Sequence, residues 1–440
     1  MARQISKFIC QNCGAEFPKW AGKCENCDQW NTLVETTIQV QKRGLNKAGS
    51  AKGRKPIKLS EVKERAVERE KTGMAELDRV LGGGLVAGSV VLLAGEPGIG
   101  KSTILTQLAM KFSGEVLYVC GEESPEQIKM RIKRLKSDKV EPCQLAFLAE
   151  TDVDVVVESI RGLVKKPGLV IVDSVQTMNT QDLTGMAGSV GQIRECSNRL
   201  LNVAKELSIP IFLVGHVTKE GAIAGPKVLE HLVDTVLYLE GDKRHIFRIL
   251  RSQKNRFGSV DEVGVFLMTD KGLEEVANPS DVFLEERQKN AAGSCVVAVM
   301  EGTRPVLVEV QALVVPSQLA VPRRVGTGVD QRRLQLMTAV LTKKLGLPLG
   351  TMDVYVNVAG GLNLKEPAAD LGICLAIVSS FKNKVVGSKT AVFGEVGLLG
   401  EIRQVSFSKK RQEEAKKLGY SLVKGPDQIK SLRELSTLIK

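Results

Sequence analysis

The chain has 440 residues, a formal net charge of +12, 43% hydrophobic residues and only 4% aromatic residues. This length predicts about three domains, and the composition is that of a globular protein rather than a disordered one. No apolar run approaches the roughly 20 residues that span a bilayer, and the first residues form no apolar signal segment. We therefore expect a cytoplasmic protein with no membrane contact. The excess of positive charge favours polyanionic partners, most often nucleic acid.

Two CxxC pairs open the chain, Cys10 with Cys13 and Cys24 with Cys27. Four thiolates at this spacing are typical of a tetrahedral structural zinc site that closes a small ribbon, here within residues 1–30. Disulfide bonds are the alternative interpretation, and the expected cytoplasmic location makes it the weaker one.

Trp20 and Trp30, the only tryptophans, flank the second cysteine pair and are expected to pack the ribbon core rather than bind a nucleobase.

The ribbon is followed by a segment that we expect to be a linker, residues 31–60. Basic residues lie among Gly, Ser and Ala farther along: Lys42, Arg43, Lys47, Lys52, Arg54, Lys55 and Lys58. This composition predicts a flexible basic linker.

Residues 61–284 alternate between strand and helix patterns. Buried strands are predicted at Val90–Ala94, Val116–Cys120, Leu145–Leu148, Leu169–Val172 and Ile209–Val214. Helices are predicted at Lys101–Phe112, Pro125–Leu135, Val153–Val164 and Gln192–Leu207. The alternation predicts an α/β domain whose mostly parallel sheet is covered on both faces. Val236–Leu239 and Ile246–Leu250 predict an antiparallel extension of that sheet.

The sequence GEPGIGKST matches the phosphate-binding loop GxxxxGK[ST] and lies between a predicted strand and a predicted helix. Its glycines let backbone N–H groups close around phosphates, Lys101 reaches the β and γ phosphates, and Ser102 offers its hydroxyl to Mg²⁺. We therefore expect ATP to bind Gly95, Glu96, Pro97, Gly98, Ile99, Gly100, Lys101, Ser102 and Thr103. A chance glycine-rich turn is the alternative, and the strand–loop–helix context disfavours it.

Polar residues follow three other predicted strands. Asp173 ends one of them and is expected to hold Mg²⁺. Glu122 and Glu123 follow another, where a carboxylate can polarise the water that attacks the γ phosphate. We favour Glu122 as this base and leave Glu123 open. His216 ends a third strand, and both a γ-phosphate sensor and an ordinary strand-end histidine remain possible interpretations.

A second α/β region is predicted over residues 285–440. Its strands are expected at Val296–Met300, Val306–Val315, Val354–Asn357 and Thr390–Phe393. Its helices are expected at Gln331–Leu345 and Ala368–Ser380.

With these features in order, the chain resembles the bacterial RadA (Sms) family of DNA repair proteins over essentially its whole length. The paired CxxC motifs, GEPGIGKST, the strand VIVDS and a C-terminal region similar to the proteolytic domain of Lon carry the resemblance. The most specific motif is Lys254–Gly258, KNRFG, the hallmark pentapeptide of the family. The resemblance implies an N-terminal zinc ribbon, a RecA-like P-loop ATPase core and a Lon-protease-like domain, with ATP, Mg²⁺ and Zn²⁺ as cofactors.

The same resemblance implies a hexameric, DnaB-like, DNA-dependent ATPase that promotes branch migration of recombination intermediates. Single-stranded DNA, branched intermediates and the RecA recombinase are its implied partners. Lys254 and Arg256 are implied to couple nucleotide, DNA and the neighbouring subunit, although a solvated basic hairpin is the alternative. The catalytic candidates are then Lys101, Glu122, Glu123, Asp173, Lys254 and Arg256.

Two segments match the DNA-binding loops of the RecA core, about Thr180–Gly191 and Val217–Lys227. Both are rich in small residues and should be mobile. Lys219 and Lys227 are candidate phosphate contacts, together with Lys254 and Arg256.

The C-terminal region departs from an active Lon. The turn that carries Lon's nucleophilic serine reads here Glu366–Pro367–Ala368–Ala369–Asp370, while Lys409 matches the lysine of the dyad. A lysine without a hydroxyl to activate gives no acyl-enzyme chemistry, so we expect a pseudo-protease that builds the ring. One group of basic residues either faces DNA or is solvated: Arg323, Arg324, Arg332, Arg333, Lys343 and Lys344.

The sequence disfavours two other classes of function. A regulatory RecA-like ATPase of the KaiC kind, acting on protein partners, is disfavoured by the cysteine pairs, the net charge and KNRFG. An ATP-dependent protease is disfavoured by Ala368 and Ala369.

Overall fold

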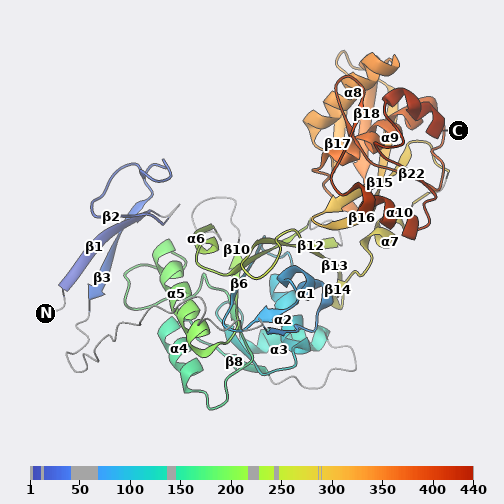
Figure 1. Ribbon diagram of the computed structural model, residues 1–440. Helices are drawn as coiled ribbons and strands as arrows, with labels where there is room; N and C mark the ends of the chain where they lie inside the picture. The colour runs from blue at the N-terminus through green and yellow to red at the C-terminus, as the bar shows by residue number, and fades with distance from the viewer. Residues whose placement is uncertain are drawn as a thin grey trace, which may run out of the picture. The chain divides into compact units, whose positions relative to one another are not determined.

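The computed structural model describes residues 3–10, 14–40, 68–135, 145–216, 227–241, 247–285, 287–288 and 290–439. The chain divides into two compact units (Figure 1). One comprises Met1–Gly241, Arg248–Val260 and Phe266–Glu275, and the other Asp242–Phe247, Asp261–Val265 and Val276–Lys440. The main part of the second unit therefore begins somewhat before residue 285, and the basic linker predicted at residues 41–60 lies outside the described residues. None of the described helices is both long and apolar enough to span a membrane.

The N-terminal ribbon is an antiparallel sheet in the order β2-β1-β3. Its strands are β1 (Arg3–Cys10), β2 (Glu16–Phe17) and β3 (Leu33–Val40). The small core consists of Cys10, Cys24 and Leu33, with Phe8 and Phe17 packed against it.

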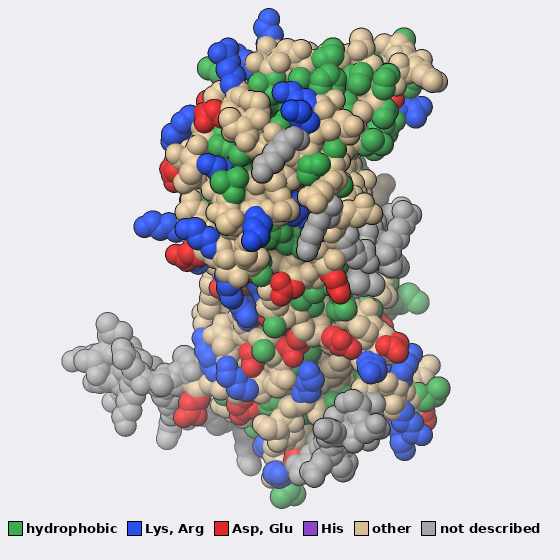
Figure 2. All heavy atoms as spheres, turned by 90° about the vertical axis from the view of Figure 1, so that its right-hand side faces the viewer, with side chains coloured by type: hydrophobic (Ala, Val, Ile, Leu, Met, Phe, Trp, Pro, Cys, Tyr) green, Lys and Arg blue, Asp and Glu red, His purple; other side chains and the backbone are tan. Residues whose placement is uncertain are grey.

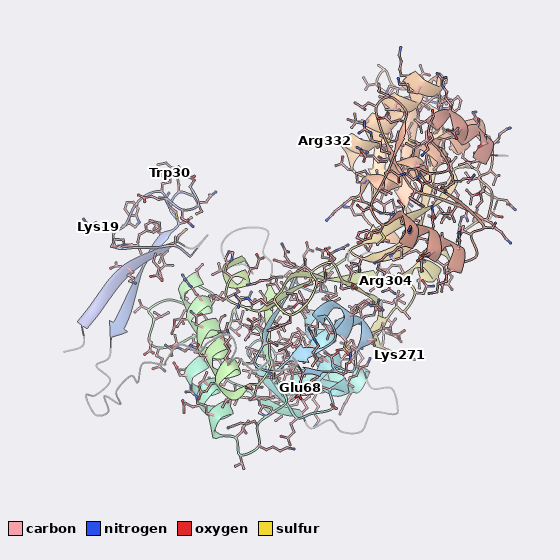
Figure 3. All side chains as sticks on the ribbon, in the orientation of Figure 1. Lys19, Trp30, Glu68, Lys271, Arg304 and Arg332 are labelled. Atoms are coloured by element: carbon pink, nitrogen blue, oxygen red, sulfur yellow. The ribbon has the colours of Figure 1, made fainter. Side chains whose placement is uncertain are left out.

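Both tryptophans of the ribbon lie at its surface. Trp20 is 60% exposed and Trp30 is 69% exposed, and Figure 3 shows Trp30 on a loop of the ribbon. The prediction that they pack the ribbon core is therefore wrong.

A nine-stranded sheet forms the middle of the first unit, in the order β14-β13-β12-β11-β6-β10-β9-β7-β8. The run from β8 to β11 is parallel, and β12 then pairs antiparallel with β11. The strands of the parallel run are β6 (Val90–Gly95), β7 (Val116–Cys120), β8 (Leu145–Leu148), β9 (Leu169–Asp173), β10 (Ile211–His216) and β11 (Thr235–Glu240). The remaining strands are β12 (Phe247–Asn255), β13 (Val263–Thr269) and β14 (Gly272–Glu275). The loops after β6, β7, β9 and β10 consequently meet at one edge of the sheet, where ligands bind in such folds.

Helices cover both faces of this sheet (Figure 1). Side chains alternate along a strand, so Val90 and Leu92 of β6 pack in one core with α4 and α5, while Val91 and Leu93 pack in the other with α1 to α3. The helices are α1 (Ala75–Leu81), α2 (Lys101–Lys111), α3 (Pro125–Leu135), α4 (Val153–Gly162), α5 (Val190–Leu207) and the short α6 (Lys227–Glu230). A short hairpin pairs β4 (Arg69–Glu70) with β5 (Leu85–Val86).

The second unit is built on a six-stranded mixed sheet in the order β17-β18-β16-β15-β19-β22. Its strands are β15 (Ser294–Glu301), β16 (Arg304–Pro316), β17 (Arg324–Thr327), β18 (Met352–Val358), β19 (Thr390–Val392) and β22 (Leu422–Lys424). The helices are α7 (Pro279–Leu284), α8 (Gln331–Leu345), α9 (Asp370–Lys382) and α10 (Ser408–Lys417), and a small hairpin pairs β20 (Glu395–Val396) with β21 (Ile402–Arg403). The mixed α/β class predicted for both parts of the chain is confirmed.

Candidate functional site

The phosphate-binding loop joins β6 to α2. Gly98 and Gly100 have positive φ angles of 77° and 117°, which glycine adopts without strain. The Lys101 ammonium group donates to the carbonyl oxygens of Gly95 at 2.9 Å and Glu96 at 3.0 Å. Burial lowers the pKa of Lys101 to about 8, against the opposing charges of Asp173 and Glu122. The lysine is thus held over a loop shaped to receive phosphate oxygens.

Arg248, at the start of β12, supports this loop from a neighbouring strand. Its side chain is buried, and its Nε donates to the carbonyl oxygen of Ile99 at 3.1 Å. No sequence motif singled out this residue, because its contact depends on how β11 brings β12 beside β6.

Asp173 ends β9 and is almost completely buried. Its Oδ2 accepts a hydrogen bond of 2.8 Å from the Tyr118 hydroxyl, while its Oδ1 is buried and has no hydrogen-bond partner among the described residues. Burial raises the pKa of Asp173, and the Tyr118 and Ser102 hydroxyls oppose that rise. A buried carboxylate oxygen with no partner, close to Ser102 at the start of α2, fits an oxygen-ligated divalent cation.

Backbone hydrogen bonds position Glu122 beside Asp173. The N–H groups of Gly121 and Glu122 both donate to the Asp173 carbonyl oxygen, at 2.8 and 3.1 Å. Any side chain at Gly121 would collide with the Thr177 hydroxyl, 2.1 Å from the position of a Cβ atom. This turn therefore needs glycine to bring Glu122 to the end of β9.

The carboxylate of Glu122 is held from two sides. The Ser174 hydroxyl donates to it at 2.5 Å, and His216 Nε2 lies 3.2 Å from one of its oxygens. The His216 hydrogen bond is the main cause that holds the pKa of Glu122 below its ordinary value, so this carboxylate is ionised at neutral pH. Glu123 instead forms an ion pair with Arg131 of α3. The two adjacent glutamates therefore have different surroundings.

Several buried polar side-chain atoms have no hydrogen-bond partner within the part of the chain that the structure describes. Among the described residues, side-chain atoms of this kind belong to Glu123, Arg131, Asp173, Gln176 and Ser197. Gln176 follows β9 and donates to the His216 carbonyl oxygen at 3.4 Å. Unpaired buried groups are costly, and the unpaired oxygen of Asp173, close to Ser102, fits a site completed by ATP and Mg²⁺.

The ribbon cysteines form a second candidate site. The Sγ atoms of Cys10, Cys24 and Cys27 all lie within 4.8 Å of one another, and those of Cys10 and Cys27 are 3.6 Å apart. A tetrahedral zinc with Zn–S bonds of about 2.3 Å separates its sulfur ligands by roughly 3.8 Å, so this spacing fits zinc. None of these three thiols is joined in a disulfide bond. Cys13, the fourth predicted ligand, lies outside the described residues.

Comparisons with known proteins agree with both sites. A family model described as an AAA domain matches residues 55–222, and one described as a rubredoxin metal binding domain matches residues 8–35. DNA repair protein RadA of Halalkalibacterium halodurans is 51% identical, covering 97% of this chain and 93% of the relative. RadA proteins of Bacillus subtilis and Listeria monocytogenes are 50% and 49% identical, each covering 96% of this chain and 92% of the relative. The chain belongs to the RadA family of DNA repair proteins.

A solved structure titled as that of the RadB recombinase also aligns, at 23% identity and a TM-score of 0.38. The alignment covers 47% of this chain and 99% of the RadB chain.

The KNRFG motif of this RadA-family chain lies away from its own phosphate-binding loop. Arg256 donates to Asp234 Oδ1 at 3.0 Å, and Asp234 Oδ2 accepts from the backbone N–H of Val90, the first residue of β6. Lys254 donates to carbonyl oxygens near the end of α6, including that of Glu230 at 2.6 Å. The phosphate-binding loop follows the opposite end of β6, roughly 17 Å away at about 3.3 Å per residue. The structure thus brings Lys101, Glu122 and Asp173 together, but not Lys254 and Arg256.

The first candidate DNA-binding loop, Thr180–Gly191, forms hydrogen bonds with α5 in its first half. Gln192, buried in α5, accepts from the Thr180 N–H at 2.8 Å and donates to the carbonyl oxygens of Thr180 and Leu183 at 3.1 and 3.0 Å. These hydrogen bonds hold the first half of Thr180–Gly191 against α5, and the mobility of the segment stays a prediction. Of the second loop, residues 217–226 with Lys219 lie outside the described part of the chain, and Lys227 is the first residue of α6.

Two of the basic residues that the sequence offered as a DNA-facing surface are engaged within the C-terminal unit. Arg324 donates to the carbonyl oxygens of Met352 and Leu349, both at 2.5 Å, and Arg333 pairs with the buried Asp370. Figure 2 shows Lys and Arg side chains spread over one face of the molecule with acidic side chains among them. On that face the positive charge is not gathered into a single patch.

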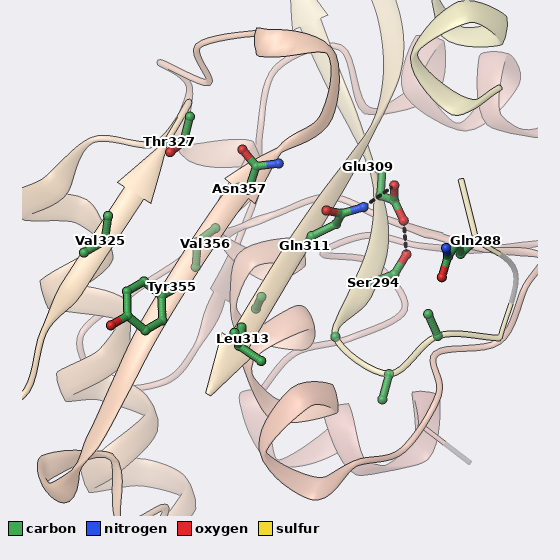
Figure 4. Close-up of a pocket in the computed structure, with 14 residues that line it drawn as sticks. Gln288, Ser294, Glu309, Gln311, Leu313, Val325, Thr327, Tyr355, Val356 and Asn357 are labelled. Atoms are coloured by element: carbon green, nitrogen blue, oxygen red, sulfur yellow. Dashed lines mark hydrogen bonds between the residues drawn. The ribbon is translucent and has the colours of Figure 1, made fainter. Parts of the chain in front are cut away.

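The C-terminal unit also contains a hollow of about 520 Å³ between β16, β17, β18 and the residues before β15 (Figure 4). Glu309 is buried at its end and accepts hydrogen bonds from the Ser294 hydroxyl and from Gln311 Nε2. Arg287 lies 3.8 Å from the same carboxylate. Ser294, Glu309 and Gln311 thus satisfy one another, and no buried side-chain atom without a partner is found among the described residues that line the hollow.

Proposed function

We propose that this chain is a DNA-dependent ATPase that works as a hexameric, DnaB-like motor and promotes branch migration in recombination and repair. The observation that carries the proposal is the group formed by Lys101, Ser102, Asp173 and Glu122 at one edge of the sheet, in a chain of the RadA family. This group contains the parts that ATP hydrolysis needs: a phosphate cradle, a cation site and a base.

In this proposal Lys101 binds the β and γ phosphates, and Ser102 and Asp173 hold Mg²⁺, which neutralises charge on the phosphates when bound. Glu122 orients and deprotonates the attacking water. Ser174 and His216 keep that carboxylate in place and ionised. Since His216 is followed directly by the second candidate DNA loop, it also acts as the sensor that links the γ phosphate to that loop.

Lys254 and Arg256 serve a neighbouring subunit in this proposal. Their distance from the phosphate-binding loop of their own chain leaves no short route to its nucleotide, whereas head-to-tail packing in a ring places one subunit's motif beside another's loop. A guanidinium supplied from outside can stabilise charge on the transferring phosphoryl group. The half-exposed side chain of Arg256 is suited to that role.

Single-stranded DNA and branched intermediates are the proposed nucleic-acid ligands, with Lys219 and Lys227 as phosphate contacts and the RecA recombinase as partner in the cytoplasm. The net charge of +12 supports a polyanionic ligand.

The C-terminal unit is proposed to be a Lon-like pseudo-protease that helps to build the ring. Ala368 and Ala369 are buried where a nucleophile would be needed, and Lys409 is exposed. The nearest serines along α9, Ser379 and Ser380, both accept hydrogen bonds from backbone N–H groups. None of these residues forms a hydroxyl–amine pair that could attack a carbonyl.

A strand-exchange intermediate with a labelled arm tests the proposal directly. We expect the purified protein to extend the heteroduplex when ATP and Mg²⁺ are present, and Lys101→Ala to abolish that extension. Hydrolysis of ATP without any movement of the junction would contradict the motor function while leaving the ATPase intact.

A further inference from the structure

Tyr118 is a buried phenol beside the nucleotide site that no sequence motif identifies. It lies in β7, which pairs directly with β9 so that Cys120 is opposite Asp173. The side chain is completely buried, and its hydroxyl donates to Asp173 Oδ2 at 2.8 Å. A buried phenol requires a hydrogen-bond partner, and here the partner is the carboxylate proposed to hold Mg²⁺.

We propose that Tyr118 is a positioning residue that holds Asp173 by Oδ2 and thereby presents Oδ1 to the magnesium ion beside Ser102. The inference rests on the proposed ATPase function and adds a residue to it. The asymmetry of the carboxylate supports it, because Oδ2 is bonded while Oδ1 is buried with no partner among the described residues. An oxygen left in that state costs free energy unless a ligand completes it.

The side chain of Tyr118 also belongs to the hydrophobic core between the sheet and helices α1 to α3. Its ring lies 6.2 Å from the ring of Phe147 in β8. The aromatic ring is therefore packed independently of the hydroxyl, and phenylalanine would fill the same space.

The expected size of the effect follows from other metal sites. Partners that orient a metal-binding carboxylate typically contribute about 10–100-fold to metal affinity or activity. Without the Tyr118 hydroxyl, the Asp173 carboxylate can rotate about its terminal torsion, which is a soft one. We therefore expect the loss in magnesium binding rather than in contacts with the nucleotide itself.

Tyr118→Phe in the full chain tests the inference, with binding of a fluorescent, non-hydrolysable ATP analogue as the readout. We expect the analogue to bind equally well to wild type and variant when magnesium is chelated. In a magnesium titration, the concentration that gives half of the magnesium-dependent increase in affinity should rise by about 10–100-fold in the variant.

Tyr238→Phe is the matched control, since it removes a comparable phenol–carboxylate hydrogen bond, the one of 3.1 Å to Glu230. It should behave as wild type. In an Asp173→Asn background, Tyr118→Phe should bring no further change in the magnesium requirement. A further change in that background would show that Tyr118→Phe acts on the pocket by a route other than Asp173, and would contradict the inference.

A wild-type magnesium requirement in Tyr118→Phe would overturn the inference. An equal loss of analogue affinity with and without magnesium would overturn it too, because it would show a general disturbance of the pocket. If the wild-type protein itself binds the analogue without any effect of magnesium, the proposed ATPase function fails first.

Discussion

At the scale of single residues, the two adjacent glutamates show what a local motif can and cannot predict. The apolar strand before them places both at the carboxyl edge of the sheet, and the sequence shows that much. Which one faces the nucleotide depends on the turn at Gly121, whose N–H binds the Asp173 carbonyl oxygen. The contacts of Glu122 with Ser174 and His216, and of Glu123 with Arg131, come from segments far apart in the chain.

The first prediction concerns these glutamates. We expect Glu122→Gln to bind ATP but to hydrolyse it about 10²–10⁴-fold more slowly, the usual contribution of a general base. Glu123→Gln is the neighbouring control and should retain most of its turnover. Steady-state phosphate release, measured beside equilibrium nucleotide binding, distinguishes the two. If Glu123→Gln had no ATPase activity and Glu122→Gln were nearly normal, Glu123 rather than Glu122 would be the general base.

The second prediction concerns the protonation of Lys101. Burial lowers the pKa of this group to about 8 in the nucleotide-free protein, while ATP requires the charged ammonium. Below that pH the lysine is already protonated and adds no pH dependence. Above it, binding must take up a proton, so affinity should fall by up to about tenfold per pH unit.

Calorimetric titration of ATP analogues across this pH range measures the effect. Lys101→Arg is the matched control, because a guanidinium remains protonated throughout and any remaining binding should not depend on pH in this range. Constant affinity of the wild type well above pH 8 would contradict the assignment of Lys101 as the phosphate-binding cation.

At the scale of elements, the buried strands of the parallel sheet are predictable because both of their faces are covered. β7 and α3 have the predicted bounds, whereas β12 runs on to Asn255, beyond the predicted end. The elements α1, β13 and β14 are missed, since each is at most seven residues long and so gives little periodicity. Tyr118 carried one usable signal, a phenol in an otherwise aliphatic buried strand.

The position of KNRFG is an element-scale result as well. The spacing and composition of the sequence do not show that β12 ends beside the amino end of β6. This position follows from the antiparallel pairing of β12 with β11, in which Val236 lies opposite Lys254. The motif and the phosphate-binding loop therefore belong to opposite edges of one sheet.

The third prediction is complementation between two inactive variants. The Lys101→Ala variant lacks the phosphate-binding lysine of its own nucleotide site. The Arg256→Gln variant lacks the guanidinium that a subunit supplies to its neighbour's nucleotide site. Each variant alone should therefore have little ATPase activity. In an equal mixture, about a quarter of head-to-tail interfaces combine an intact Lys101 with an intact Arg256. ATP turnover should then recover to a corresponding fraction of the wild-type rate.

Subunits must be mixed under conditions that allow exchange before the assay. The double variant mixed with Lys101→Ala serves as the negative control, because no interface there is complete. A mixture no more active than its two components would show that Arg256 acts within its own chain.

At the scale of the whole molecule, the sequence predicted three functional parts and their order, and the structure resolves two compact units. In the C-terminal unit, the turn before α9 has a structural contact with α10. Arg411 is buried and donates to Glu366 at 2.7 and 2.8 Å, directly before the buried alanines. Such a contact joins α10 to the start of α9 and could not be read from spacing, because the two residues belong to separate elements.

The central claim is that DNA drives the ATPase, and the ATP hydrolysis rate with and without single-stranded DNA tests it most directly. We predict a rate well above the basal one with DNA, and a half-saturating DNA concentration that rises with salt, by about 0.7 in log–log slope for each phosphate contact. Lys101→Ala should show neither the basal nor the stimulated rate. A rate that DNA leaves unchanged at every salt concentration would contradict the account and favour an ATPase that acts on protein partners.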